Sequence, residues 1–237
     1  MKIRTGYSFY GQEVGVLTFK NIEPRVPGDA GHAASFDYPV RFEVLEGSFA
    51  KLLKPDETMR QNIINACLKL KSEGIKGIVS NCGMMSLYQD SIGAEIGLPF
   101  VGSALCQIPF IWQLIGRSGS IGILTGHSEY LSEAHLKASG WNEEIKLSIQ
   151  GLQNEPHFAD IVINGGLDLD VELMDRDILH GATLLKEKTP DLRAIIIECS
   201  NLSTYSKHVA EELEIPVFDT LSAADMLARA INPCKYI

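Results

Sequence analysis

The feature that most constrains this sequence is an internal repeat with an offset of 117 residues, because residues 68–110 align without a gap on residues 185–227. Apolar matches alone are common to all strand–helix–strand units, but a cysteine at the same strand end in both copies is not. The repeat therefore predicts two halves with one architecture. The identical pairs include Leu68/Leu185, Lys69/Lys186, Ile78/Ile195, Cys82/Cys199, Ser86/Ser203, Tyr88/Tyr205, Glu95/Glu212 and Pro99/Pro216.

Short, nearly continuous apolar runs separate the stretches with helical spacing. Such runs are typical of strands that are buried on both faces of a parallel sheet. A weaker internal similarity, with an offset of 107 residues, relates residues 14–18 to residues 121–125. The alternation of strands and helices predicts the α/β class. The expected strands are residues 14–17, 76–79, 120–124, 161–163 and 193–197, and the expected helices include residues 56–73, 203–213 and 221–231.

We expect two similar Rossmann-like lobes whose parallel sheets are related by a pseudo-twofold axis. The first lobe comprises residues 1–103 plus 215–237 and carries Cys82, and the second comprises residues 104–214 and carries Cys199. Equivalent loops of the two lobes then face each other, which predicts an active site in the cleft between them. Residues 19–38 form a long Pro- and Gly-containing loop, and ordered loops of this length are often functional.

Composition narrows the class of partner. The 237 residues include 21 Lys plus Arg and 30 Asp plus Glu, so the net charge is −9, which argues against a nucleic acid partner. No apolar run is long enough to span a membrane, and no apolar segment follows Met1. The odd number of cysteines, five, does not indicate a disulfide scaffold. We therefore expect a cytoplasmic protein with reduced thiols and a small-molecule substrate.

The two cysteines related by the repeat are the candidate catalytic residues. Cys82 and Cys199 each follow a buried strand and precede a helix, at the sheet edge where α/β folds bind ligands. A nearby helix N-terminus favours the thiolate form. Two thiols on opposite sides of one carbon could remove a proton from one face and return it to the other. A redox pair is an alternative, although no C-x-x-C motif is present. Cys67, Cys106 and Cys234 are interpreted as structural.

The two cysteine loops, residues 80–83 (Ser-Asn-Cys-Gly) and 198–201 (Glu-Cys-Ser-Asn), resemble the motifs of the cofactor-independent aspartate/glutamate racemase superfamily. This group also contains hydantoin racemases, maleate isomerases and arylmalonate decarboxylases. Residues 122–125 (Gly-Ile-Leu-Thr) and 215–219 extend the resemblance over nearly the whole chain. It implies two α/β lobes, a homodimer, and inversion or a related carbanion step next to a carboxylate. It also implies that neither pyridoxal phosphate nor a metal takes part.

The motifs depart from those of the amino-acid racemases, which carry Cys-Asn-Thr in the first loop and Cys-Thr in the second. Backbone N–H groups of the first loop and the polar side chains of the second can still bind a carboxylate. Arg25 is the candidate cation because its planar fork suits a carboxylate, although a surface role is equally open. His127 is given no catalytic role. The predicted substrate contacts are Arg25, Asn81, Gly83, Met84, Thr125, Ser200 and Asn201.

The leading hypothesis is therefore a racemase or epimerase of an amino acid or related carboxylate, acting through Cys82 and Cys199 as a two-base pair. An alternative is a related carbanion enzyme, such as a hydantoin racemase, a cis–trans isomerase or a decarboxylase of a diacid. Two cysteines favour racemisation or isomerisation, because a decarboxylase could work with one. A two-lobed binding protein without turnover is a third reading, but binding alone does not need a thiol on each lobe.

Overall fold

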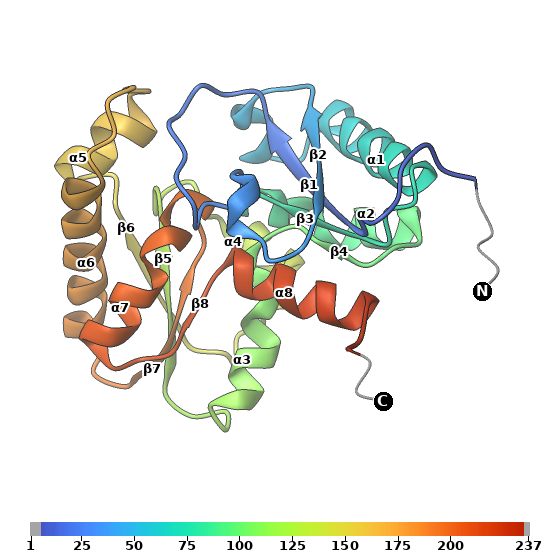
Figure 1. Cartoon of the computed structure of the whole chain (residues 1–237). Coiled ribbons are helices and arrows are strands. Elements are labelled where there is room, and N and C mark those ends of the chain that lie inside the picture. The colour runs from blue at the N-terminus through green and yellow to red at the C-terminus, as the bar shows by residue number, and fades with distance from the viewer. Residues whose placement is uncertain (1–5, 235–237) are drawn as a thin grey trace.

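The computed structural model describes residues 6–234 and contains two four-stranded parallel sheets (Figure 1). The strand orders are β2-β1-β3-β4 and β6-β5-β7-β8, so each half has the same topology. The predicted α/β class with two similar lobes is confirmed. The first sheet contains β1 (Val14–Phe19), β2 (Val40–Leu45), β3 (Gly77–Ser80) and β4 (Phe100–Val101), and the second contains β5 (Ser120–Thr125), β6 (Leu147–Gly151), β7 (Leu192–Ile197) and β8 (Val217–Phe218).

Helices flank both sheets, and several begin at an aspartate whose side chain accepts backbone N–H groups. Asp56 accepts from Met59, and Asp170 accepts from Glu172 and Leu173, which satisfies donors that a helix start leaves unpaired. The α-helices are α1 (Glu57–Ser72), α2 (Gln89–Ile96), α3 (Ile108–Leu114), α4 (Glu133–Ala138), α5 (Pro156–Phe158), α6 (Val171–Lys188), α7 (Ser206–Leu213) and α8 (Thr220–Ile231). Shorter 3₁₀ segments include η2 (Phe49–Leu52), η3 (Gly83–Tyr88), η4 (Ala104–Gln107) and η6 (Ser200–Tyr205).

The structure reproduces the sequence repeat residue by residue. In the first half β3 leads to η3, α2 and β4, and in the second half β7 leads to η6, α7 and β8, with the bounds of the last three elements offset by 117 residues. Each short helix also ends on a left-handed residue, Gly97 with φ 60° and Glu214 with φ 54°. The two halves thus share local backbone detail as well as topology.

Glu214 gives a direct test of this equivalence. A left-handed conformation crowds the Cβ of an ordinary residue, whereas glycine adopts it freely. We expect Glu214→Gly to raise the free energy of unfolding by about 0.5–1 kcal/mol, because it removes that crowding at an exposed helix end. Urea denaturation is the measurement, and Gly97→Ala at the equivalent position should lower stability. A loss of stability in Glu214→Gly would contradict the expectation.

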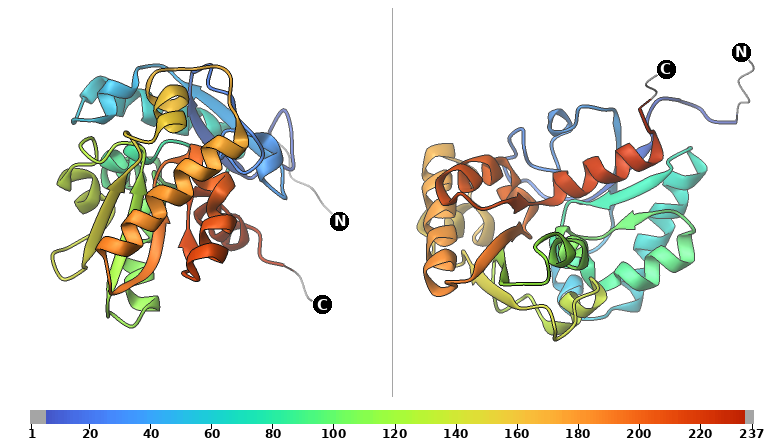
Figure 2. Two further views of the ribbon diagram at one scale, coloured as in Figure 1. Left: turned by 90° about the vertical axis from the view of Figure 1, so that its left-hand side faces the viewer. Right: turned by 90° about the horizontal axis from the view of Figure 1, so that it is seen from below.

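Side chains alternate between the faces of each strand and form three packed layers. In the first sheet, Val14 and Val16 pack toward α8, while Leu17 packs toward α1. In the second sheet, one face joins the same core as α1, and the other packs against α6 and α7. Seen from below, the halves lie side by side with α3 and α8 between them (Figure 2). One core therefore continues across both lobes and fixes their relative position.

One expected strand was wrong, and the strand that takes its place in the sheet was not predicted. Residues 161–163 are not a strand but part of a π-helical turn, Ala159–Ile163, where Ile161 packs with Phe158 at helical spacing. The strand beside β5 is β6, whose half-buried residues mix polar and apolar side chains and so lack an apolar run. No helix within residues 6–234 is both long and apolar enough to cross a membrane.

The expected lobe boundary at residue 215 also needs correction. β8 pairs with β7 and so belongs to the second sheet, although residues 215–237 were assigned to the first lobe. α8 does pack against β3 of the first sheet. The chain therefore crosses back to the first lobe between β8 and α8, where Asp219 caps the helix.

Candidate active site

A cavity of about 580 Å³ opens where strands of both sheets end, and residues of both lobes line it. Its size suits a small molecule. The first lobe contributes the end of β1 and the loop after β3, and the second contributes the end of β5 and the loop after β7. All nine residues proposed from the sequence lie along this cavity: Arg25, Asn81, Cys82, Gly83, Met84, Thr125, Cys199, Ser200 and Asn201.

The two cysteines occupy equivalent positions in the cavity wall. Cys82 precedes η3 and Cys199 precedes η6, and both are half-buried with extended backbones. Burial raises the pKa of the Cys82 thiol to about 12 and raises the pKa of Cys199 well above its ordinary value. A charge on Cys82 further raises the pKa of Cys199, so the thiols lie close enough to interact. In these surroundings both thiols are therefore protonated at neutral pH.

The surroundings of the two thiols differ. The backbone N–H of Met84 lowers the pKa of Cys82, and the positive charge of Arg25 acts in the same direction against the larger opposing charge of Glu23. The Cys199 sulfur instead donates to Asn201 Oδ1 at 3.7 Å, and this bond favours the protonated thiol, although the Asn201 backbone N–H acts the other way. The Arg25 charge acts on Cys82, which makes Cys82 the better candidate for the thiol that ionises.

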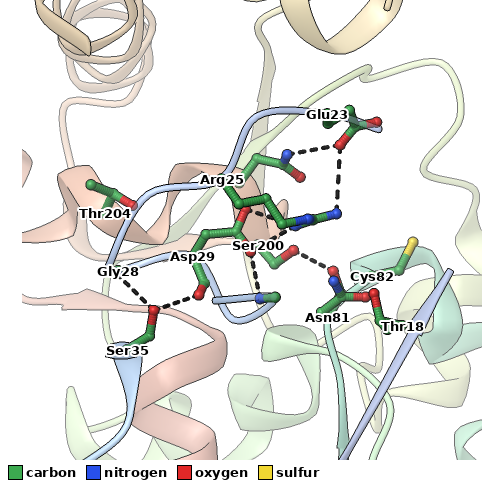
Figure 3. A network of polar contacts seen from close by, with 12 residues as sticks. Thr18, Glu23, Arg25, Gly28, Asp29, Ser35, Asn81, Cys82, Ser200 and Thr204 are labelled. Carbon is green, nitrogen blue, oxygen red and sulfur yellow. Dashed lines mark hydrogen bonds and ion pairs between the residues drawn. The ribbon is translucent and has the colours of Figure 1, made fainter. Parts of the chain in front are cut away.

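Arg25 is less free than the sequence suggests. Its guanidinium donates to both carboxylate oxygens of Asp29 at 2.7 Å, and it lies 3.6 Å from a Glu23 oxygen (Figure 3). Asp29 is buried and also accepts the backbone N–H of Gly31. These contacts hold the loop after β1 in shape, and two carboxylates offset much of the charge that a substrate carboxylate would meet.

The same loop is pressed against the second lobe. Gly28 has φ +104°, and a Cβ there would lie 2.6 Å from the Cα of Thr204, so only glycine allows this approach. Glu23 accepts a hydrogen bond from Asn201 Nδ2 at 3.0 Å. Ser200 donates to the backbone oxygen of Asn81, which ties the two cysteine loops together (Figure 3). Ser200 and Asn201 thus organise the site as well as line it.

Glu198 is a cavity residue to which the sequence analysis assigned no role. It is 2% exposed, and its Oε2 accepts a 2.6 Å hydrogen bond from Thr125, the hydroxyl predicted to contact substrate. Burial raises the pKa of its carboxyl to about 7, and its charge raises the pKa of both thiols. An available signal was its place directly after the apolar run of β7, because a carboxylate at the end of a buried strand is functional more often than structural.

The raised pKa of Glu198 makes folding stability depend on pH. The folded state keeps this proton to about pH 7, whereas the unfolded chain loses it near 4.5, so stability falls as pH rises through that window. The free energy of unfolding should fall by about 3 kcal/mol in total, and this fall should be complete above pH 7. We expect the difference in unfolding free energy between Glu198→Gln and the parent to grow in favour of the variant from pH 4.5 to 8. Urea titrations at several pH values measure it, and a constant difference would contradict the assignment.

Aromatic side chains from both lobes form another part of the cavity wall. Tyr130 stacks on His127 with ring centroids 4.0 Å apart, and it meets Phe49 of the first lobe at 6.2 Å. Lys20 and Arg25 are the lysine and arginine side chains along this wall within the described part of the chain. The cavity therefore combines apolar and aromatic surface with few positive charges.

Comparisons with known proteins give the fold and the family. An unliganded arylmalonate decarboxylase is similar with a TM-score of 0.64 and 14% identity over 94% of both chains. A glutamate racemase from Bacillus anthracis is similar with a TM-score of 0.59 and 10% identity over 92% of this chain and 82% of that one. A dimethylsulfoniopropionate lyase from Durusdinium sp. clade D is 30% identical over 219 residues, covering 88% of this chain and 72% of that protein. No family model matches the sequence.

The fold is that of the aspartate/glutamate racemase superfamily, as the cysteine loops indicated. By sequence, the chain belongs to the dimethylsulfoniopropionate lyase family. The protein is thus an enzyme, rather than the non-catalytic binding protein considered from the sequence. The relatives favour the alternative of a related carbanion enzyme over the racemase hypothesis.

Proposed function

We propose that this enzyme is a lyase that cleaves dimethylsulfoniopropionate, or a close relative with a cationic leaving group, into an acrylate and a neutral sulfide. The observation that carries the proposal is the 30% identity to a lyase of that name over most of the chain. The proposed chemistry starts with removal of a proton from the carbon next to the carboxylate. That is the step for which the superfamily resemblance suggested the paired thiols.

The charges along the cavity support a substrate with one carboxylate and one cation. A dicarboxylate such as glutamate needs positive partners at both ends, whereas Arg25 is already held by Asp29 and Glu23. Two further features, the Glu198 carboxylate and the aromatic pair Phe49 and Tyr130, suit a cation better than an anion. A β-sulfonium carboxylate has both parts, with the positive sulfur two bonds from the carbon that loses its proton.

In the proposed reaction, Cys82 is the base because Arg25 and the Met84 N–H favour its thiolate. The thiolate takes the α-proton, the C–H electron pair becomes the second bond of the alkene, and the C–S pair leaves with dimethyl sulfide. The leaving group departs neutral and needs no acid. Cys199 stays protonated and donates to the substrate carboxylate, where negative charge increases as the proton leaves. Cys82 then releases its proton to solvent.

The test is to incubate the purified protein with dimethylsulfoniopropionate and measure dimethyl sulfide by headspace gas chromatography and acrylate by proton NMR. Equal amounts of the two products are expected. Absence of both products at millimolar substrate would reject the proposal. Single enantiomers of aspartate, glutamate and substituted hydantoins in heavy water provide the comparison, because loss of their α-proton signals would instead support the racemase hypothesis.

A further inference from the structure

Glu198 presents an electrostatic problem for the proposed chemistry. Its ionised carboxylate would lie beside both thiols and oppose their ionisation, and it would also oppose negative charge on the reacting carbon. Within the described part of the chain, no lysine, arginine or histidine offsets it: its resolved influences are burial and the Thr125 hydrogen bond. Ionising a buried carboxyl without a cation is costly, which is why its pKa is raised, so a cationic ligand is what would hold this carboxylate ionised.

The other acidic groups of the site are already engaged. Glu23 binds the Asn201 amide and lies near Arg25, and Asp29 binds Arg25 through both oxygens. Glu198 Oε2 accepts only from a neutral hydroxyl, and Oε1 lies against Gly83, where a Cβ would come within 1.9 Å of it. The absence of a side chain at residue 83 thus brings the carboxylate of the second lobe up to the cysteine loop of the first.

We propose that Glu198 is the anionic part of a subsite for an onium cation, which recognises the positive sulfur of the substrate and excludes carboxylates of the same shape that lack a cationic group. This inference rests on the proposed function for the identity of the cation. The geometry supports it because Glu198 neighbours both thiols, and a sulfonium two bonds from the reacting carbon must lie near the same place. Tyr130 and Phe49 supply aromatic faces on the cavity wall, which attract onium groups.

The subsite also explains how a thiolate could form when it is needed. The Glu198 charge adds to burial in keeping Cys82 protonated. A bound cation offsets that charge and acts on Cys82 in the same direction as Arg25. The base would therefore be generated in the presence of a ligand that carries both the α-proton and the leaving group, while a simple carboxylate would leave the thiol protonated.

Two ligands of matched shape test the subsite by binding rather than by turnover. Dimethylsulfoniopropionate and 4-methylpentanoate differ only in the replacement of S⁺ by C–H. Their dissociation constants are measured by isothermal titration calorimetry on Cys82→Ser, in which turnover is slow, and on Cys82→Ser/Glu198→Gln. We expect the second substitution to weaken the sulfonium ligand by at least about tenfold, as close charge pairs do at interfaces, without weakening 4-methylpentanoate.

The ratio of the two dissociation constants decides the outcome. Equal weakening of both ligands would mean that Glu198 only maintains the shape of the cavity, and no change for either would remove it from recognition. Both results overturn the subsite. Thr125→Val in the Cys82→Ser background removes the hydrogen bond that lowers the Glu198 pKa, so all variants are compared at pH 9, where the carboxyl is ionised. There it should keep the ratio within about threefold of the parent, well below the tenfold loss expected without the charge. If the wild-type protein releases no dimethyl sulfide, the proposed function fails, yet the binding ratio still judges the onium subsite.

Discussion

Cys82→Ser is expected to lower the rate of dimethyl sulfide release by about 10²–10⁴-fold, the range that a positioned acid–base group contributes. A serine hydroxyl has nearly the shape of the thiol but ionises far less readily, so the site should keep its geometry and lose its base. Arg25 and the Met84 N–H stabilise negative charge at this atom, which is why Cys82 rather than Cys199 should show the greater loss. The measurement is turnover per folded enzyme, with folding checked by circular dichroism.

Cys199→Ser makes the roles of the two thiols distinguishable. A serine at this position can still donate to the substrate carboxylate, so we expect a loss smaller than that of Cys82→Ser, and Cys199→Ala should lose more activity than Cys199→Ser. Cys234→Ser is the matched control because Cys234 is exposed and lies outside this cavity. Equal losses in Cys82→Ser and Cys199→Ser would contradict the assignment of base and donor.

The repeat explains why so much of the fold was predictable. Two copies of one strand–helix–strand pattern were recognisable because Cys82 and Cys199 share a position that apolar matches alone do not create. The same equivalence predicted that both loops would meet at one cavity, and they do. β6 escaped prediction for a physical reason: it is an edge strand with half-buried polar residues, and its pairing with β5 is a long-range property.

The chemical character of the site was harder to predict, because it depends on contacts between the lobes. Arg25 was visible as a possible carboxylate partner, but its two bonds to Asp29 follow from how the loop after β1 closes. Glu198 belongs to the second cysteine motif, yet only the fold shows that its carboxylate contacts Gly83 of the first lobe. Similar motifs therefore predicted which residues would meet at one cavity, but not which charges lie beside one another in it.

Gly83→Ala is also expected to lower stability and turnover strongly, because only a residue without a side chain leaves room for Glu198 beside the first cysteine loop. A Cβ at residue 83 would lie 1.9 Å from Glu198 Oε1 and 2.4 Å from the Glu198 backbone oxygen. The carboxylate could move aside, but the backbone oxygen belongs to the segment that follows β7 and precedes Cys199, so the two cysteine loops must separate. We expect a loss of about 1–3 kcal/mol in unfolding free energy, typical of overpacking, together with at least about tenfold lower turnover.

Gly93→Ala is the matched control, since Gly93 lies within α2 and a Cβ there would meet nothing within 4 Å. It should raise stability by about 0.5–1 kcal/mol, because alanine loses less backbone entropy in a helix, and leave turnover unchanged. The double variant Gly83→Ala/Glu198→Ala, compared with Glu198→Ala in unfolding free energy, separates the two contacts, because alanine removes the side-chain oxygens and leaves the backbone oxygen in place. If the backbone oxygen is the obstacle, Gly83→Ala lowers stability in the Glu198→Ala background about as much as in the parent. Loss of the effect in that background would show instead that the clash with the side chain alone, and not separation of the cysteine loops, accounts for the defect.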